Sequence, residues 1–154
     1  MAKSTHVYVS YIRTTPEKLW QALTDPEFTK QYWFGMRSES EFKAGSPWKL
    51  VSGSSGEVWD AGAIVEADPP RRLVIRWQHM MKPEMKAEGD TLCTMDIERG
   101  KDACKLTITH TSEREHAKVI EAVSGGWPQV ISNLKSLLET GAVTFSDRFT
   151  ACAS

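Results

Sequence analysis

Apolar residues near the end of the chain recur at steps of three and four residues. Within residues 126–141 they are Trp127, Val130, Ile131, Leu134, Leu137 and Leu138. This spacing predicts an amphipathic helix with one wide apolar face, and a glycine such as Gly141 commonly ends a helix. The apolar face of this helix has to cover another apolar surface.

The segments before this helix show the alternation of apolar and polar residues that is typical of β-strands. Predicted strands cover residues 6–13, 38–42, 48–51, 57–67, 72–79, 91–98 and 104–111. In the first of them, Val7, Val9 and Tyr11 share a face. The last two strands carry apolar residues on one face and polar residues on the other, so we expect an antiparallel sheet with one face in water and the other against the helix.

Two short helices are predicted between the first and second strands. Thr15 is a good N-cap residue and Pro16 suits the first helical position, which indicates a helix through Thr24. Asp25 and Pro26 repeat this signal for a second helix that ends at about residue 32.

Two further segments depart from these patterns. Pro128 cannot donate a hydrogen bond to the carbonyl of Ser124, and two glycines precede it, so we predict a break or kink between a helical segment at residues 113–123 and the late helix. Residues 80–90 mix methionine with charge and show no alternation. They are predicted to form a loop at one end of the sheet, with methionines that cover the mouth of a pocket.

The composition fits one domain and excludes several classes of partner. The 154 residues predict a single domain over 1–154, with a core at about 6–141 and a C-terminal tail at 142–154. The formal net charge is −1, with basic residues interspersed among acidic ones, so no nucleic-acid partner is expected. No apolar run approaches the roughly 20 residues that span a bilayer, and no signal-peptide core follows the first methionine. We therefore expect a cytoplasmic protein without membrane insertion.

The three cysteines are an odd number and lack the paired spacing of a metal site. This pattern fits reduced thiols, and Cys93 and Cys104 are interpreted as small core residues.

Four stretches of the chain together resemble one known family. They are residues 126–141, the stretch 15–27 that begins Thr-Pro-Glu-Lys-Leu-Trp, the stretch 65–77 that begins Val-Glu-Ala-Asp-Pro-Pro, and Leu-Thr-Ile-Thr-His at 106–110. In this order they are similar to the homologues of the activator of the 90-kDa heat-shock protein ATPase (AHSA-like), within the START-like superfamily. The resemblance implies an α+β helix-grip fold, also called Bet v-like, in which a curved antiparallel sheet wraps around a long C-terminal helix and leaves a cavity between them.

The same resemblance bears on function. Stand-alone relatives look like small-molecule binders, and some superfamily neighbours act as polyketide cyclases or aromatase-like enzymes. The eukaryotic co-chaperone has an additional amino-terminal domain that makes much of its contact with the chaperone, whereas this chain begins at the START-like strand. The resemblance therefore does not favour a chaperone partner, and the sequence leaves open whether the chain forms a homodimer.

The expected ligand-binding residues are those that face the space between sheet and helix. They are Trp33, Phe34, Trp59, Ile75, Trp77, Met95, Ile108, His110, Val123, Trp127, Ile131 and Leu134. This aromatic and aliphatic set suits an apolar or aromatic small molecule. The alternative is that the same side chains simply fill the interior.

His110 is the one weak candidate for catalysis, because strand alternation directs its ring toward the late helix. The alternative is a core histidine whose nitrogens bond to protein groups. His79 is placed at a strand end, at a pocket rim or exposed, and His6 and His116 are expected at the surface. No metal-ligand cluster, nucleophile motif or phosphate-binding loop is present, so we expect no metal and no cofactor.

Three functions remain after these exclusions. The favoured one is the binding of a hydrophobic or aromatic small molecule. The others are a cofactor-independent cyclase or hydrolase that uses His110, and a module that binds a protein partner.

Overall fold

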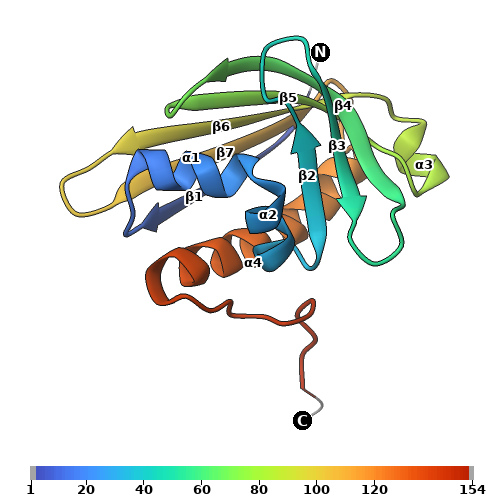
Figure 1. The fold of residues 1–154 in the computed structure, drawn as a ribbon. Helices are drawn as coiled ribbons and strands as arrows, with labels where there is room; N and C mark the ends of the chain where they lie inside the picture. The colour runs from blue at the N-terminus through green and yellow to red at the C-terminus, as the bar shows by residue number, and fades with distance from the viewer. Residues whose placement is uncertain (1–2, 153–154) are drawn as a thin grey trace.

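Seven antiparallel strands form one curved sheet that wraps around a long helix (Figure 1). The structure is a computed structural model and describes residues 3–152. The strands are β1 (Ser4–Ile12), β2 (Met36–Ser40), β3 (Pro47–Ser52), β4 (Val58–Asp68), β5 (Arg72–His79), β6 (Thr91–Arg99) and β7 (Cys104–Ser112). Their order in the sheet is β1-β7-β6-β5-β4-β3-β2, so β1 and β2 are the edges. The predicted α+β architecture is confirmed.

Four helices accompany the sheet in the part of the chain that is described. They are α1 (Pro16–Thr24), α2 (Pro26–Tyr32), α3 (Pro83–Lys86) and α4 (Lys118–Thr140). The caps of α1 and α2 agree with the sequence prediction, because Thr15 accepts a hydrogen bond from the backbone N–H of Lys18 and Asp25 accepts one from that of Glu27. Helix α2 packs against both β2 and α4, and the Trp33 side chain follows directly after it.

Helix α4 is continuous through Pro128, so of the two predicted alternatives the break is wrong, and the helix starts at Lys118 rather than Glu113. Two features explain the difference. Ser124, whose carbonyl loses its partner, lies on the exposed side of α4 and can be solvated by water. Burial of Trp127, Val130 and other apolar side chains on the opposite face holds the helix in one piece. Gly141 ends α4 in the left-handed conformation, as predicted.

Residues 80–90 contain the short helix α3 rather than a loop without secondary structure, which corrects the sequence prediction. The Met85 side chain, on α3, is half-buried, whereas that of Met81, which precedes the helix, is exposed. Figure 1 shows α3 at the end of the sheet beside the start of α4.

The inward face of β4 differs from the expected pattern. Asp60 is buried, whereas Trp59 is 36% exposed. Gly62 lies opposite Trp77 in the β4–β5 ladder, and a methyl group on Gly62 would overlap the carbonyl oxygen of Arg76. The glycine therefore lets β5 lie close enough to place Trp77 under α4.

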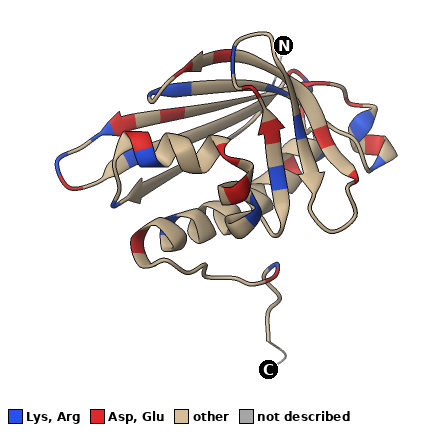
Figure 2. Cartoon of the chain, viewed as in Figure 1, with Lys and Arg blue, Asp and Glu red and all other residues tan. Residues whose placement is uncertain are grey.

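The outer face of the sheet carries both apolar and charged residues. Val7, Val9 and Tyr11 share one face of β1, as predicted, and that face is exposed. Figure 2 shows Lys and Arg intermixed with Asp and Glu over the strands and loops that are described. None of the helices within residues 3–152 is both long enough and apolar enough to span a membrane.

Candidate ligand cavity

A cavity of about 490 Å³ lies between the N-terminal half of α4 and the β4–β5 end of the sheet. Its walls are mainly apolar, and four of the six tryptophans of the chain contribute to them. The aromatic lining residues are Trp33, Trp59, Trp77 and Trp127, and the remaining apolar ones are Met36, Leu50, Met85, Val119, Ala122, Val123, Gly126 and Val130. The polar lining residues are Asp60, His79, Lys82 and Arg148.

Three of these tryptophans form a cluster that joins three separate elements. The ring centroid of Trp127 is 5.2 Å from that of Trp33 and 5.8 Å from that of Trp77, with the last pair edge to face. Behind Trp77, the ring of Trp48 is 4.4 Å away and is almost completely buried. Aromatic pairs prefer such tilted and edge-to-face arrangements, so this packing restricts the orientation of the rings, which burial of apolar surface alone would not do.

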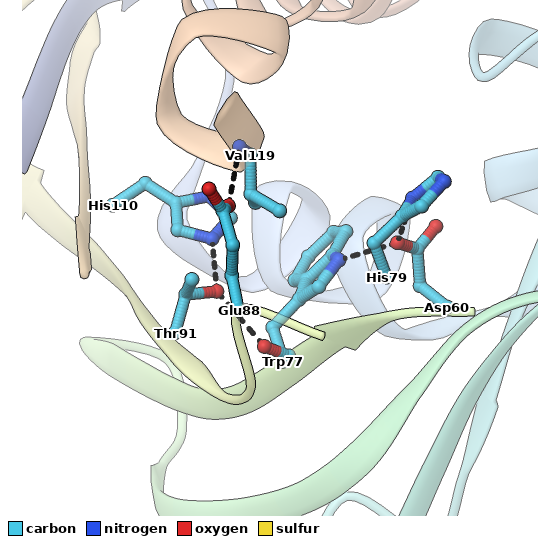
Figure 3. Close-up of polar contacts among 7 residues, drawn as sticks. All are labelled: Asp60, Trp77, His79, Glu88, Thr91, His110 and Val119. Atoms are coloured by element: carbon cyan, nitrogen blue, oxygen red, sulfur yellow. Dashed lines mark hydrogen bonds and ion pairs between the residues drawn. The ribbon is translucent and has the colours of Figure 1, made fainter. Parts of the chain in front are cut away.

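His110 lies below this cluster in a chain of hydrogen bonds. Trp127 donates its indole N–H to Nδ1 of His110 at 3.2 Å, so Nδ1 is the acceptor nitrogen. The other nitrogen, Nε2, is therefore protonated and donates to the hydroxyl of Thr91 at 2.7 Å, which in turn donates to the Trp77 carbonyl at 2.9 Å. Figure 3 shows the last part of this chain, with His110 and Thr91 beside Trp77.

The environment of His110 keeps its ring neutral. The side chain is 0% exposed, and burial lowers its pKa from 6.5 to about 4, with a smaller contribution from His6 on the neighbouring strand. Both nitrogens are bonded to protein groups, so no lone pair or proton is left for a ligand. His6 itself is half-buried rather than at the surface, which corrects the sequence prediction.

His79 and Asp60 form a second polar pair, at the wall of the cavity. Oδ1 of Asp60 accepts the indole N–H of Trp77 at 2.9 Å and lies 3.1 Å from Nδ1 of His79. Because a carboxylate accepts hydrogen bonds, Nδ1 carries the proton and Nε2 has the lone pair. This Nε2 is buried and has no hydrogen-bond partner among the described residues. Figure 3 shows the three side chains in one row across β4 and β5.

One cover of the cavity is the α3 segment, which is fastened to the start of α4. Helix α4 has no capping side chain of its own at Ala117. Instead, the Glu88 carboxylate accepts the backbone N–H groups of Lys118 at 2.9 Å and Val119 at 3.1 Å. Figure 3 shows the bond to Val119. A carboxylate at a helix N-terminus satisfies free donors and interacts favourably with the helix dipole. Met85 and Lys82 reach the cavity from this segment.

The other cover is the C-terminal tail, which packs back against α4. The side chain of Asn133 exchanges two hydrogen bonds with the backbone of Phe145, at 3.0 and 2.7 Å. Gln129 accepts the backbone N–H of Phe149 at 2.8 Å. Between these anchors, Arg148 lies over the ring of Phe34 at 5.2 Å and lines the cavity.

Of the twelve predicted ligand-binding residues, five line the cavity: Trp33, Trp59, Trp77, Val123 and Trp127. Six others are buried in the core away from it: Ile75, Met95, Ile108, His110, Ile131 and Leu134. Phe34 lies under Arg148 instead of in the lining. The expected approach of Trp127 to Trp77 and His110 is present.

Sequence reasoning missed three of the four polar lining residues, which are Asp60, Lys82 and Arg148, whereas a pocket rim was one of the two positions expected for His79. Asp60 is in phase with Ile64 on β4, and both side chains are buried. Strand alternation from Ile64 was therefore the signal that could have placed Asp60 on the inward face. Lys82 and Arg148 reach the cavity from segments without periodicity, so no pattern pointed to them. Within residues 3–152, no group of three His, Cys, Asp or Glu side chains is arranged to hold a metal ion.

A larger hollow of about 800 Å³ lies elsewhere and is less suited to a ligand of this kind. Its lining is rich in charged side chains that pair with one another. Arg72 is 2.8 Å from Asp96 and 3.4 Å from Glu66. The aromatic cavity is therefore the better candidate for binding.

The neutral state of His110 predicts a loss of stability in mild acid. Its folded pKa of about 4 is below the unfolded value of 6.5, so between these values the unfolded chain binds more protons. The free energy of unfolding should be fully maintained above pH 6.5 and fall with pH through this window, by up to about 1.4 kcal/mol per pH unit. Urea denaturation at pH 7, 6 and 5 measures this slope.

The matched variants are His110→Gln and His116→Gln, since His116 is exposed. We expect His110→Gln to be less stable at pH 7 but to show a shallower slope, and His116→Gln to behave like the unaltered protein. Equal slopes in all three proteins would contradict the assignment.

The hydrogen bonds of Glu88 predict that this one carboxylate attaches the α3 segment to the start of α4. Glu88→Ala should remove the cap of α4, at a cost of about 1 kcal/mol to local stability. Amide hydrogen exchange, measured by mass spectrometry, should then become faster both in residues 80–90 and in the first turn of α4. Glu84→Ala, at an exposed position of α3, is the control and should leave exchange unchanged. Unchanged exchange in Glu88→Ala would rule out this role.

Comparisons with known proteins agree with the fold. The family model of Activator of Hsp90 ATPase homolog 1-like proteins matches residues 13–139. Among curated proteins, none matches this chain. A solved structure from Mesorhizobium loti is similar with a TM-score of 0.76 and 22% identity, covering 88% of this chain and 97% of that one.

Two further solved structures are similar at the same level. The Aha1 dimer from Colwellia psychrerythraea has a TM-score of 0.70 and 20% identity, covering 92% of this chain and 98% of that one. An HSP90 activator from Plasmodium falciparum has a TM-score of 0.70 and 22% identity, covering 87% and 95%. The match of the family model over most of the sequence confirms the resemblance, and the chain belongs to the family of Activator of Hsp90 ATPase homolog 1-like proteins.

Proposed function

We propose that this protein binds a small hydrophobic or aromatic molecule in the cavity between α4 and the sheet. The observation that carries the proposal is the wall of four tryptophans around a space of about 490 Å³. Small-molecule sites are typically concave, of roughly 300–1,000 Å³, mostly apolar, and supplied with a few polar groups. The cavity meets each of these conditions.

The two tryptophans of the inner wall support an aromatic ligand in particular. The indole N–H groups of Trp77 and Trp127 are already bonded to Asp60 and His110. Their rings therefore offer faces and edges to a ligand rather than hydrogen-bond donors, which suits stacking.

A neutral fluorescent probe, N-phenyl-1-naphthylamine, tests this function. We expect saturable binding, seen as quenching of tryptophan emission together with a gain in probe emission. Val123→Trp places a large ring in the cavity from α4 and should weaken binding by tenfold or more, about 1.4 kcal/mol. Val65→Trp, at an exposed position of β4, is the matched control and should bind normally. Absence of saturable binding, or equal binding by both variants, would overturn the proposal.

A proton-transfer reaction on a bound aromatic molecule is the second candidate function. Its candidate base is His79, which lines the cavity with Nε2 unpartnered and Nδ1 held by Asp60. A histidine oriented by a carboxylate in this way is a common general base. His110, the candidate from the sequence, has both nitrogens engaged by protein groups and cannot fill this role.

The probe 5-nitrobenzisoxazole tests this second function. A base removes its ring C–H proton, the C–H electrons complete a nitrile, and the N–O bond breaks to leave a coloured phenolate. We expect catalysis above buffer that falls roughly tenfold or more in His79→Gln and is retained in His116→Gln. If His79→Gln retains the full rate, His79 is not the base.

A chaperone partner, which the resemblance did not favour, and a homodimer, which the sequence left open, are not part of this proposal. The relatives that are named as an HSP90 activator and as a dimer are 22% and 20% identical to this chain, a level that shows the fold alone.

A further inference from the structure

We infer that the ligand of this cavity is an aromatic acid, whose rings lie among the tryptophans and whose anionic group lies at the mouth beside Lys82 and Arg148. This inference rests on the proposed binding function and narrows it to one class of ligand. It follows from the distribution of charge in the lining.

The inner part of the cavity offers little to a charged group. The only carboxylate in the lining, Asp60, is buried and already accepts hydrogen bonds from Trp77 and His79. The remaining inner surface is tryptophan, methionine and aliphatic side chains. Moving an ionised group into such surroundings is costly unless it is paired, so an ionised part of the ligand has to remain near the mouth.

The mouth, meaning the exposed part of the lining, in contrast carries two positive charges from two different covers. Lys82 comes from the segment that leads into α3, and Arg148 comes from the C-terminal tail; both are exposed residues that also line the cavity. Neither forms an ion pair within residues 3–152. The lining thus holds two cations and one carboxylate, and that carboxylate is engaged.

The acidic neighbour of Arg148 leaves its guanidinium available. Asp147 precedes Arg148 in the chain, but its carboxylate accepts the backbone N–H of Arg148 rather than pairing with the guanidinium. The guanidinium instead lies over the ring of Phe34, which keeps it beside the cavity. An arginine in this position can receive a carboxylate through two parallel hydrogen bonds.

An amphipathic anion can interact favourably with both the apolar inner lining and the two cations. Its rings bury apolar surface against the tryptophans, and its carboxylate stays in the exposed part of the lining, to which Lys82 and Arg148 contribute. A neutral aromatic molecule of the same shape gains only the first contribution. A cationic one is repelled at the mouth.

The experiment compares 2-naphthoate with 2-naphthamide, which has the same rings and a neutral head group. Affinities are measured by quenching of tryptophan fluorescence and by titration calorimetry in low and high salt. We expect 2-naphthoate to bind about tenfold more tightly than 2-naphthamide in low salt, and this advantage to shrink in high salt.

Three variants assign the effect to the two cations. Lys82→Met and Arg148→Met should each weaken 2-naphthoate binding by about two- to fivefold, and the double variant by about tenfold, without a change for 2-naphthamide. Lys101→Met, in the turn between β6 and β7, is the control and should alter neither affinity. Thermal unfolding of each variant verifies that it is folded.

The possible results separate the two proposals. Equal affinities for the two naphthalenes, or variants that weaken both to the same degree, would overturn the aromatic-acid inference while leaving the binding function standing. If neither naphthalene binds, the proposed function fails and the inference fails with it.

Discussion

The hydrogen-bond chain from Trp127 through His110 and Thr91 to the Trp77 carbonyl is the interaction on which the cavity depends. It connects α4 to three adjacent strands, β7, β6 and β5. Each donor in it has one acceptor, so none of the linked side-chain polar atoms of Trp127, His110 and Thr91 is left buried without a partner, a state that costs about 1–3 kcal/mol. The same bonds orient the Trp127 ring against Trp77 and thereby set the shape of the cavity floor. A neutral imidazole is required, because a protonated one could not accept from Trp127.

Most of the fold could be predicted from local signals. Thr15 and Asp25 mark two helix starts because a cap is a short-range interaction, and strand alternation reports burial on one face of a sheet. The prediction failed at Pro128, where the rule for proline considers only the helix itself. It does not include the water available to Ser124 or the apolar surface that α4 buries on its other side. Tertiary packing decided that case.

The candidate site was less accessible to sequence reasoning. Alternation and helical spacing located Trp77 and Trp127, since both lie on regular elements. The sequence favoured His110 over His79 as the reactive histidine, because strand alternation directed His110 toward the late helix. It could not show their hydrogen-bond partners, which come from other strands and from α4. Only the folded arrangement shows that His110 is fully engaged and that His79 keeps one nitrogen unpartnered. Arg148 reaches the cavity because the tail folds back, and no repeat in the sequence records that path.

The close approach of β4 and β5 at Gly62 makes the tolerance of this domain to mutation uneven. Every substitution at Gly62 adds a Cβ that overlaps the Arg76 carbonyl, so the backbone of β5 has to move, and Trp77 moves with it. A residue without a side chain, and outside the lining, thus controls one wall of the cavity. Natural variants or random mutagenesis at this position can reshape the cavity while every lining residue is intact. In a mutational scan, such a position would resemble a residue of the cavity lining, although its role is to let two strands lie close together.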